Sequence, residues 1–207
     1  MDPIEKLSAI FIKFPGIGKR QAKRFVYHLL SMNDSYIKEL AASIASIRSV
    51  VSECASCHRF FSLKNGKKSL VCDICSNEQT DKETLLVVEK DVDLENIQKS
   101  GAYHGMYFIL GGTLPFLDKS PDDVIRSKSL IERVSMDAKN NILKEIILAL
   151  SATSEGEHTA LYVKKILDPL AQKYNTKITV LGRGLSTGTE LEYSDSDTLT
   201  NALKNRG

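Results

Sequence analysis

The stretch TLLVVEKDVDLENIQKSGAYHGMYFILGG, residues 84–112, decides the fold class of this chain. Its first part, TLLVVE, is a continuous apolar run that stops at Glu89, and MYFILGG is a second apolar run that ends in two glycines. Short apolar runs of this kind are typical of strands buried on both faces. Between them, DVDLENIQKSG has the composition of a short helix with an acidic N-cap and a C-terminal glycine. The stretch therefore predicts a strand, a helix and a second strand.

The same alternation continues toward the C-terminus. A loop and a helix over about 121–138 precede the apolar run EIILAL, residues 145–150. The segment EHTALYVKKILDPLAQKY (157–174) predicts a further helix, and KITVLGRG (177–184) predicts the last strand. Strands and helices that alternate in this way indicate a mostly parallel sheet covered by helices on both faces.

A helical hairpin is expected before this α/β part. Residues 3–14 and 19–32 have helical periodicity, and the Pro and two glycines of PGIG at 15–18 predict a tight turn between them. A third helix is expected over about 34–50.

Basic residues gather around this hairpin. Residues 1–30 hold six lysines and arginines against two acids, although the net charge of the whole chain is only +2. Four of these cations follow the PGIG turn: Lys19, Arg20, Lys23 and Arg24. Backbone N–H groups at a helix start, together with cations spaced four residues apart, suit phosphate groups without reading bases. We therefore predict sequence-independent DNA contact here, with a solvated basic face on a structural hairpin as the alternative.

All four cysteines fall into one pattern of two C-x-x-C pairs: Cys54, Cys57, Cys72 and Cys75. Two such pairs supply the four soft ligands of a tetrahedral Zn²⁺ and leave no open position for catalysis. The segment KNGKK at 64–68 predicts a hairpin turn between the pairs. The pattern therefore predicts one structural zinc ion per chain, with His58 as a bystander. The alternatives are two disulfides, which a cytoplasmic location disfavours, or four unrelated buried thiols.

Neither a signal peptide nor a membrane span is expected. No apolar run approaches the roughly 18–20 residues needed to cross a bilayer. Asp2 and Glu5 stand where a signal peptide would be basic. With 42% hydrophobic and 26% charged residues, the composition is that of a soluble globular protein, which we expect in the cytoplasm.

The acidic stretch after EIILAL, SATSEGEHTA (151–160), resembles part of the Toprim fold, which topoisomerases, primases and some nucleases share. In catalytic Toprim domains the first strand ends in a glutamate, matched here by Glu89. A later strand ends in Asp-x-Asp, which holds magnesium and in type IA topoisomerases runs into R-E-G-E. Glu155 and Glu157 match the E-G-E part of that pattern.

The two aspartate positions of the Toprim pattern are occupied here by Ser151 and Thr153. Because hydroxyls are poor substitutes for the charged oxygen ligands that Mg²⁺ prefers, we predict a non-catalytic Toprim domain. The pair Asp91 and Asp93 follows the first strand and is expected to serve the N-terminus of the next helix. The alternative is a divalent-metal-dependent nuclease or primase that uses the glutamates.

Across almost the entire chain, the motifs resemble those of the bacterial RecR recombination mediators. The resemblance is carried by FPGIGKRQAKRFVYHLL, CASC…CDIC, LLVVEKDVDLENIQKSGAYHGMYFILGGTLPFLD, SEGEHTALYV and RGLSTGTELEYSDSDTL. It implies a multidomain α/β protein with a helix-hairpin-helix region for DNA binding and oligomerisation at 1–53. A four-cysteine zinc finger at 54–78, a Toprim domain at 79–182 and a short C-terminal oligomerisation segment at 183–207 would follow.

The resemblance also implies a function without enzymatic activity. RecR-type proteins form ring-shaped tetramers that clamp single- or double-stranded DNA in the bacterial nucleoid. With RecO, and in many bacteria RecF, they help to load RecA onto DNA covered by single-strand-binding protein. Residues implied on the partner-binding Toprim face are Glu89, Tyr103, His104, Glu155 and Glu157. Packing is the alternative for Tyr103, and Arg183 is expected either to reach a phosphate or to cap the sheet.

Overall fold

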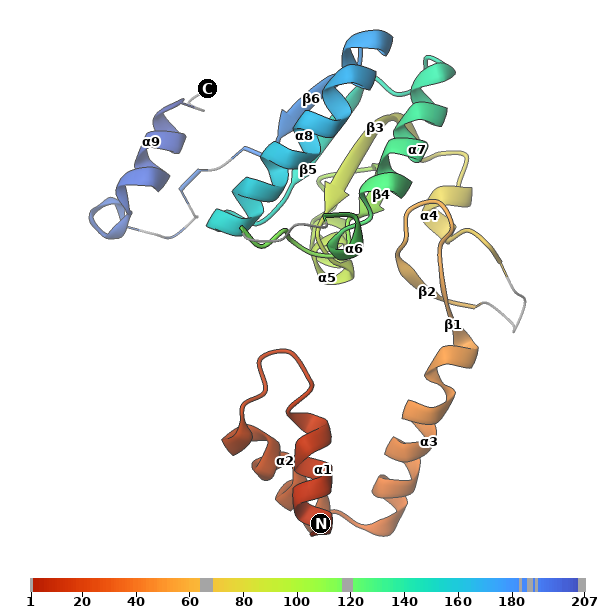
Figure 1. Cartoon of the computed structure of the whole chain (residues 1–207), viewed down its shortest axis with the longest axis vertical. Coiled ribbons are helices and arrows are strands. Elements are labelled where there is room, and N and C mark those ends of the chain that lie inside the picture. The colour runs from red at the N-terminus through yellow and green to blue at the C-terminus, as the bar shows by residue number, and fades with distance from the viewer. Residues whose placement is uncertain are drawn as a thin grey trace. The chain divides into compact units, whose positions relative to one another are not determined.

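The computed structural model describes most of the chain: residues 2–63, 69–116, 121–182, 184–185, 188 and 190–204. The turn predicted at 64–68 and Arg183 lie outside the described residues. The chain divides into two compact units, Met1–Val51 and Ser52–Gly207 (Figure 1).

The first unit consists of three helices: α1 (Pro3–Phe11), α2 (Lys19–Ser31) and α3 (Asp34–Val50). The helices α1 and α2 form a hairpin, and Gly16 in its turn has a φ of 74°, which favours glycine. Ala22 and Val26 of α2 are buried, and the rings of Phe11 and Phe25 meet edge-on with centroids 5.7 Å apart. The predicted helix-hairpin-helix is confirmed, with α1 ending three residues earlier than expected.

The second unit is built around a four-stranded sheet in the order β4-β3-β5-β6. Its strands are β3 (Asp81–Val88), β4 (Gly105–Ile109), β5 (Glu145–Ala149) and β6 (Lys177–Val180). All three pairings are parallel, and Leu86 of the central strand β3 stands beside Tyr107 of β4 and Ile147 of β5. The predicted parallel sheet is confirmed.

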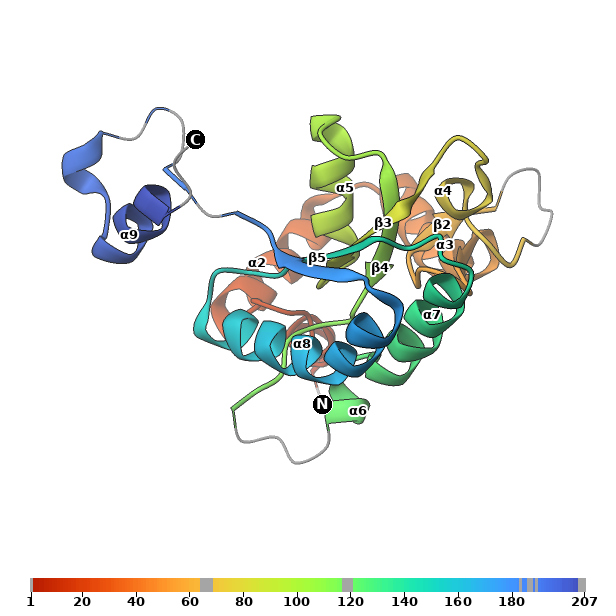
Figure 2. The same ribbon diagram turned by 90° about the horizontal axis from the view of Figure 1, so that it is seen from above.

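Helices cover both faces of this sheet (Figure 2). On one face α5 (Asp91–Ser100) packs its Leu94 against the side chains of Leu86 and Val88. On the other face α7 (Ser127–Lys139) and α8 (Ser154–Tyr174) pack against the alternate strand residues, Leu85 and Val87 among them. Burial on both faces explains why the strands read as continuous apolar runs.

The single helix expected over about 121–138 is divided into α6 (Pro121–Val124) and α7. The chain turns at Arg126, whose backbone N–H donates to the Leu110 carbonyl at 2.8 Å and whose guanidinium donates to the Ile109 carbonyl at 3.3 Å. Because that N–H is bound at the end of β4, it cannot continue a helical hydrogen-bond ladder.

The strand β1 (Val51–Glu53) begins at the last residue of the first unit. Short elements complete the second unit: β2 (Phe60–Ser62), α4 (Asp73–Ser76), the 3₁₀ turn η2 (Leu191–Tyr193) and α9 (Ser196–Lys204). The strands β1 and β2 pair with each other beside the cysteine pairs. The elements η2 and α9 form the predicted short C-terminal segment. No described helix is both long and apolar enough to cross a bilayer.

Candidate functional sites

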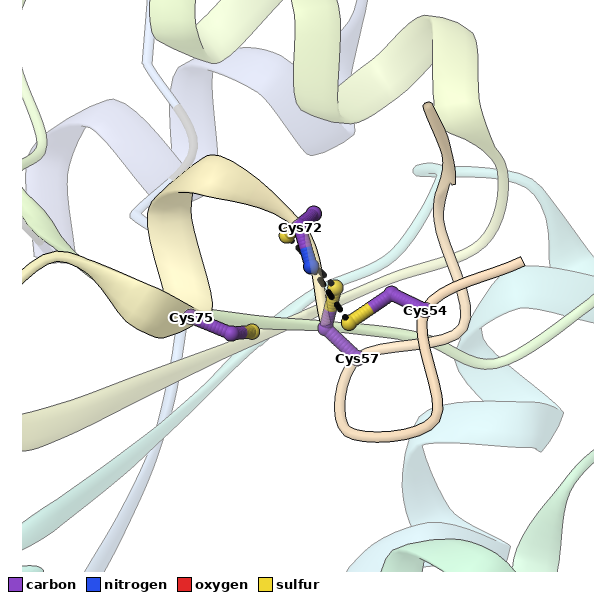
Figure 3. Close-up of side chains that lie close together, drawn as sticks. All are labelled: Cys54, Cys57, Cys72 and Cys75. Atoms are coloured by element: carbon purple, nitrogen blue, oxygen red, sulfur yellow. Dashed lines mark hydrogen bonds between the residues drawn. The ribbon is translucent and has the colours of Figure 1, made fainter. Parts of the chain in front are cut away.

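The sulfurs of the four cysteines converge on one point (Figure 3). They lie within 4.8 Å of one another, and the Sγ atoms of Cys57 and Cys72 are 3.7 Å apart. In a tetrahedral site with Zn–S bonds of about 2.3 Å, neighbouring sulfurs are about 3.8 Å apart. Three of the thiols are buried, Cys75 is partly exposed, and all four are free rather than joined in disulfides. The cluster therefore fits a tetrahedral metal ion.

Backbone turns hold each cysteine pair in shape. The N–H of His58 donates to the Cys54 carbonyl at 2.9 Å, and the N–H of Ser76 donates to the Cys72 carbonyl at 3.0 Å. These turns direct both sulfurs of a pair toward the same side. The His58 ring itself is engaged elsewhere, because its Nδ1 lies 2.8 Å from the Glu53 carboxylate and its edge meets Phe108 at 5.2 Å.

The cysteine pairs are also fastened to the sheet and to α5. The N–H of Ile109 in the edge strand β4 donates to the Cys57 carbonyl at 2.9 Å. The Asp91 carboxylate at the start of α5 accepts the N–H of Phe60 in β2 at 2.8 Å. The N-cap of α5 is Lys90 and not the acid expected from the sequence. Asp91 lies in the first turn of α5, where it serves the cysteine module as well as its own helix.

A buried cation from α7 completes this attachment and was missed in the sequence. Arg133 is 7% exposed; it donates to the Ser56 carbonyl at 3.0 Å and pairs with Asp137 at 2.6 Å. Desolvation opposes its charge, but Asp137 and Cys75 beside it hold its pKa above the usual value. A fixed positive charge at this position would offset the negative charge of four metal-bound thiolates. In the sequence, the indication of this buried role is that the arginine stands next to Val134, directly beside the apolar face of the predicted helix.

At the carboxyl end of the sheet, Glu89 is buried, with 4% of its surface exposed. Its carboxylate accepts the backbone N–H of Ser151 at 2.6 Å. Glu89 follows β3 and Ser151 follows β5, so this hydrogen bond ties the ends of two neighbouring strands. In this chain the first Toprim glutamate is therefore engaged in holding the backbone.

The helix α8 begins at Ser154, three residues earlier than expected. The reason is Thr153, whose hydroxyl caps the helix by accepting the N–H of Gly156 at 3.1 Å. A Cβ on Gly156 would lie 2.1 Å from the Ser151 carbonyl oxygen, so the helix can approach this closely only at a glycine. A threonine followed by acids in the next turn is a helix-start signal that the sequence already contained.

The two acids of E-G-E lie in the first turn of α8, and both are exposed. Glu155 accepts a long hydrogen bond of 3.5 Å from the Thr113 hydroxyl. The structure thus places Glu155 and Glu157 at the same end of the sheet as Glu89, on a surface that a partner can reach.

Tyr103 and His104 lie at the other end of the sheet, because they precede β4. The Tyr103 hydroxyl donates to the Met106 carbonyl at 2.9 Å, its ring meets Tyr107 edge-on, and burial raises its phenol pKa. His104 is exposed, and both residues line a mostly polar cavity of about 400 Å³ bordered by residues of α4 and α5. The five residues expected on one partner-binding face are therefore not on one face. Glu155 and Glu157 are exposed at one end of the sheet, Glu89 is buried at that end, and Tyr103 and His104 lie at the other end.

The four cations predicted to bind DNA are all exposed on α2. Lys23 lies 3.6 Å from the Glu5 carboxylate, and Arg24 donates to the Gln21 side chain at 3.4 Å. The N-cap of α2 is Gly18, and within the described hairpin no side chain caps this helix and no acid stands in its first turn. An uncapped helix start followed by cations is suited to bind an anion.

Comparison with known families assigns three segments of the chain. The RecR helix-hairpin-helix matches residues 4–48, the Toprim domain matches 83–182 and the RecR C-terminal segment matches 184–206.

Curated relatives match over nearly the full length. The chain is 35% identical over 204 residues to "Recombination protein RecR" of Lactobacillus helveticus, which covers 99% of this chain and 96% of the relative. It is 36% identical over 203 residues to the protein of the same name from Chloroherpeton thalassium, covering 98% and 95%. It is 36% identical over 205 residues to that of Lactococcus lactis subsp. lactis, covering 99% and 96%. With the helix-hairpin-helix, the cysteine cluster and the Toprim sheet in place, the chain belongs to the RecR family of recombination proteins.

Proposed function

We propose that this protein is a DNA-binding mediator of recombinational repair that has no enzymatic activity of its own. The observation that carries the proposal is the exposed basic face at the uncapped start of α2, in a chain of the RecR family. Its cations are Lys19, Arg20, Lys23 and Arg24. They would contact the phosphates of single- or double-stranded DNA irrespective of sequence.

The Toprim end of the sheet supports the absence of catalysis. Ser151 and Thr153 stand at the positions of the metal-binding aspartates, and Thr153 serves as the cap of α8. The Glu89 carboxylate is already bonded to the backbone of Ser151. These contacts favour a mediator over the second candidate, a metal-dependent Toprim nuclease or primase. Cleavage or priming by pure protein with Mg²⁺ or Mn²⁺, lost in Glu89→Gln, would favour the second candidate instead.

The cysteine cluster would hold one structural Zn²⁺ per chain. Bound to four thiolates, the ion would supply folding free energy to a module too small to build a core of its own. Elemental analysis should give one zinc per chain in the wild type and much less in Cys54→Ser/Cys57→Ser. A folded wild-type protein purified without chelator and containing no metal would contradict this assignment.

Exposed apolar side chains support self-association, and we propose a ring-like homotetramer that clamps DNA. No residue of α3 is buried in the described unit, and its Ile44, Ile47 and Val50 are 66%, 57% and 53% exposed. The proposed partners are RecO and, where present, RecF, which would act with the ring to load RecA in the nucleoid. The exposed acids Glu155 and Glu157, and separately the surface at Tyr103 and His104, are the proposed contacts; Glu89 would act by holding the backbone beneath the first of these surfaces.

The DNA role of α2 is tested by measuring affinity across salt concentrations with Arg20→Ala/Arg24→Ala. The log–log slope on duplex DNA should be about −0.9 per phosphate contacted, and each lost contact should flatten it by about one. A matched control is Lys38→Ala/Arg48→Ala, which removes two exposed cations from α3 of the same unit. Equal losses in both variants, or an unchanged slope in the first, would refute a specific role for α2.

A further inference from the structure

An aromatic ring stands on the same face of α2 as the two arginines. Tyr27 is 57% exposed, whereas Ala22 and Val26 of the same helix are buried. At about 100° per residue, the direction opposite to these buried side chains is that of Arg20, Arg24 and Tyr27. The ring therefore points away from the unit, within the basic face.

The spacing makes the ring a neighbour of the cations. Tyr27 follows Arg24 by three residues and Arg20 by seven, so the three side chains form one stripe along two turns of helix. The ring lies about 10 Å further along the axis than Arg20. A strand whose phosphates meet the arginines can thus bring a base over the ring within the next nucleotides.

Packing inside the unit does not account for this ring. Phe25, two positions earlier, packs edge-on against Phe11 at 5.7 Å, while more than half of Tyr27 remains in water. Cations combined with an exposed aromatic ring are the means by which proteins bind single-stranded nucleic acid, since its unstacked bases offer their faces. The bases of a duplex are stacked on each other and offer no such face.

We propose that Tyr27 is a stacking site for a base of single-stranded DNA whose phosphates are held by Arg20 and Arg24. The inference rests on the proposed function, because it requires that α2 binds DNA. The other possible occupant is a second copy of the chain. A symmetric contact through this face would bring the arginines of two copies together, so charge complementarity favours a polyanion.

The test compares three full-length variants by fluorescence anisotropy: Tyr27→Leu, Tyr27→Phe and the control Tyr36→Leu. Tyr36 is 43% exposed on α3 and lies outside the basic face. The probes are an oligothymidylate, an abasic strand of equal length and a duplex. Tyr27→Leu should weaken binding of the oligothymidylate about five-fold or more. Its salt slope and its affinity for the abasic strand should not change, and Tyr27→Phe and Tyr36→Leu should resemble the wild type.

Three results would overturn the inference. One is an unchanged affinity of Tyr27→Leu for oligothymidylate. Another is an equal loss on the abasic strand, because stacking needs a base. The third is a change in oligomeric mass by light scattering, which would make Tyr27 a subunit contact. If Arg20→Ala/Arg24→Ala binds DNA like the wild type, the proposed function fails first and takes the inference with it.

Discussion

The starts of α2 and α8 place the same backbone feature in opposite surroundings. Each is a helix N-terminus whose first N–H groups lack partners within the helix. At α2 the N-cap is Gly18, which has no side chain to offer, and cations follow. At α8 the hydroxyl of Thr153 caps the helix, and Glu155 and Glu157 occupy the first turn.

Because of this difference, the start of α2 can bind a ligand, whereas the start of α8 is bonded within the protein. At α8 the chain supplies its own oxygen to the helix start and its own carboxylate, from Glu89, to the neighbouring Ser151 N–H. At α2 the corresponding oxygen must come from water or from a ligand. Changes at α8 should therefore affect stability, and changes at α2 should affect DNA binding.

Of the substitutions at these two helix starts, Gly156→Ala is expected to have the largest effect on stability. The added methyl group would lie 2.1 Å from the backbone oxygen of Ser151, a residue whose own N–H is bonded to the Glu89 carboxylate. We expect the free energy of unfolding, measured by circular dichroism in urea, to fall by about 3 kcal/mol. A loss below about 1 kcal/mol would mean that the start of α8 is not tightly held.

A smaller effect is expected at Glu89. Glu89→Ala leaves the Ser151 N–H without its carboxylate and should cost about 2 kcal/mol of unfolding free energy. Glu89→Gln keeps an oxygen that can accept the hydrogen bond, so it should cost less than half as much. Equal losses of unfolding free energy in the two variants would show that the negative charge of Glu89, and not its hydrogen bond, stabilises this contact with Ser151.

The smallest effect on stability is expected from Gly18→Ala, the counterpart of Gly156→Ala at α2. No atom lies within 4 Å of the added methyl group, so unfolding should change by only about 0.5 kcal/mol. The same methyl group stands where a phosphate would approach the helix start, so DNA affinity should fall several-fold. If the affinity is unchanged, the phosphate is held by side chains alone.

The sequence predicted the features that short-range rules determine. Apolar run length predicted β3 through β6, and the turn residues Pro15 and Gly16 predicted the break between α1 and α2. The C-x-x-C spacing predicted the cysteine cluster because a tetrahedral ion needs paired ligands close together.

Contacts between distant residues could not be predicted in this way. Arg133 reaches Ser56 across 77 positions, and Glu89 reaches Ser151 across 62. The first contact depends on where the cysteine pairs pack against α7, and the second depends on which strands become neighbours in the sheet. Local periodicity specifies neither. By contrast, the resemblance grouped Tyr103 with the three glutamates, and the direction of the predicted parallel strands already separates them. Tyr103 precedes β4, whereas the glutamates follow β3 and β5.

The bond between Ile109 and Cys57 has a consequence for solubility. The strand β4 is at the edge of the sheet, and the uncovered N–H groups of an edge strand can pair with another molecule. The backbone turn at the first cysteine pair occupies one of these groups, and Arg126 occupies the Ile109 carbonyl. If the cysteine module unfolds, the edge of β4 is uncovered. We then expect aggregation through strand pairing as the first observable effect.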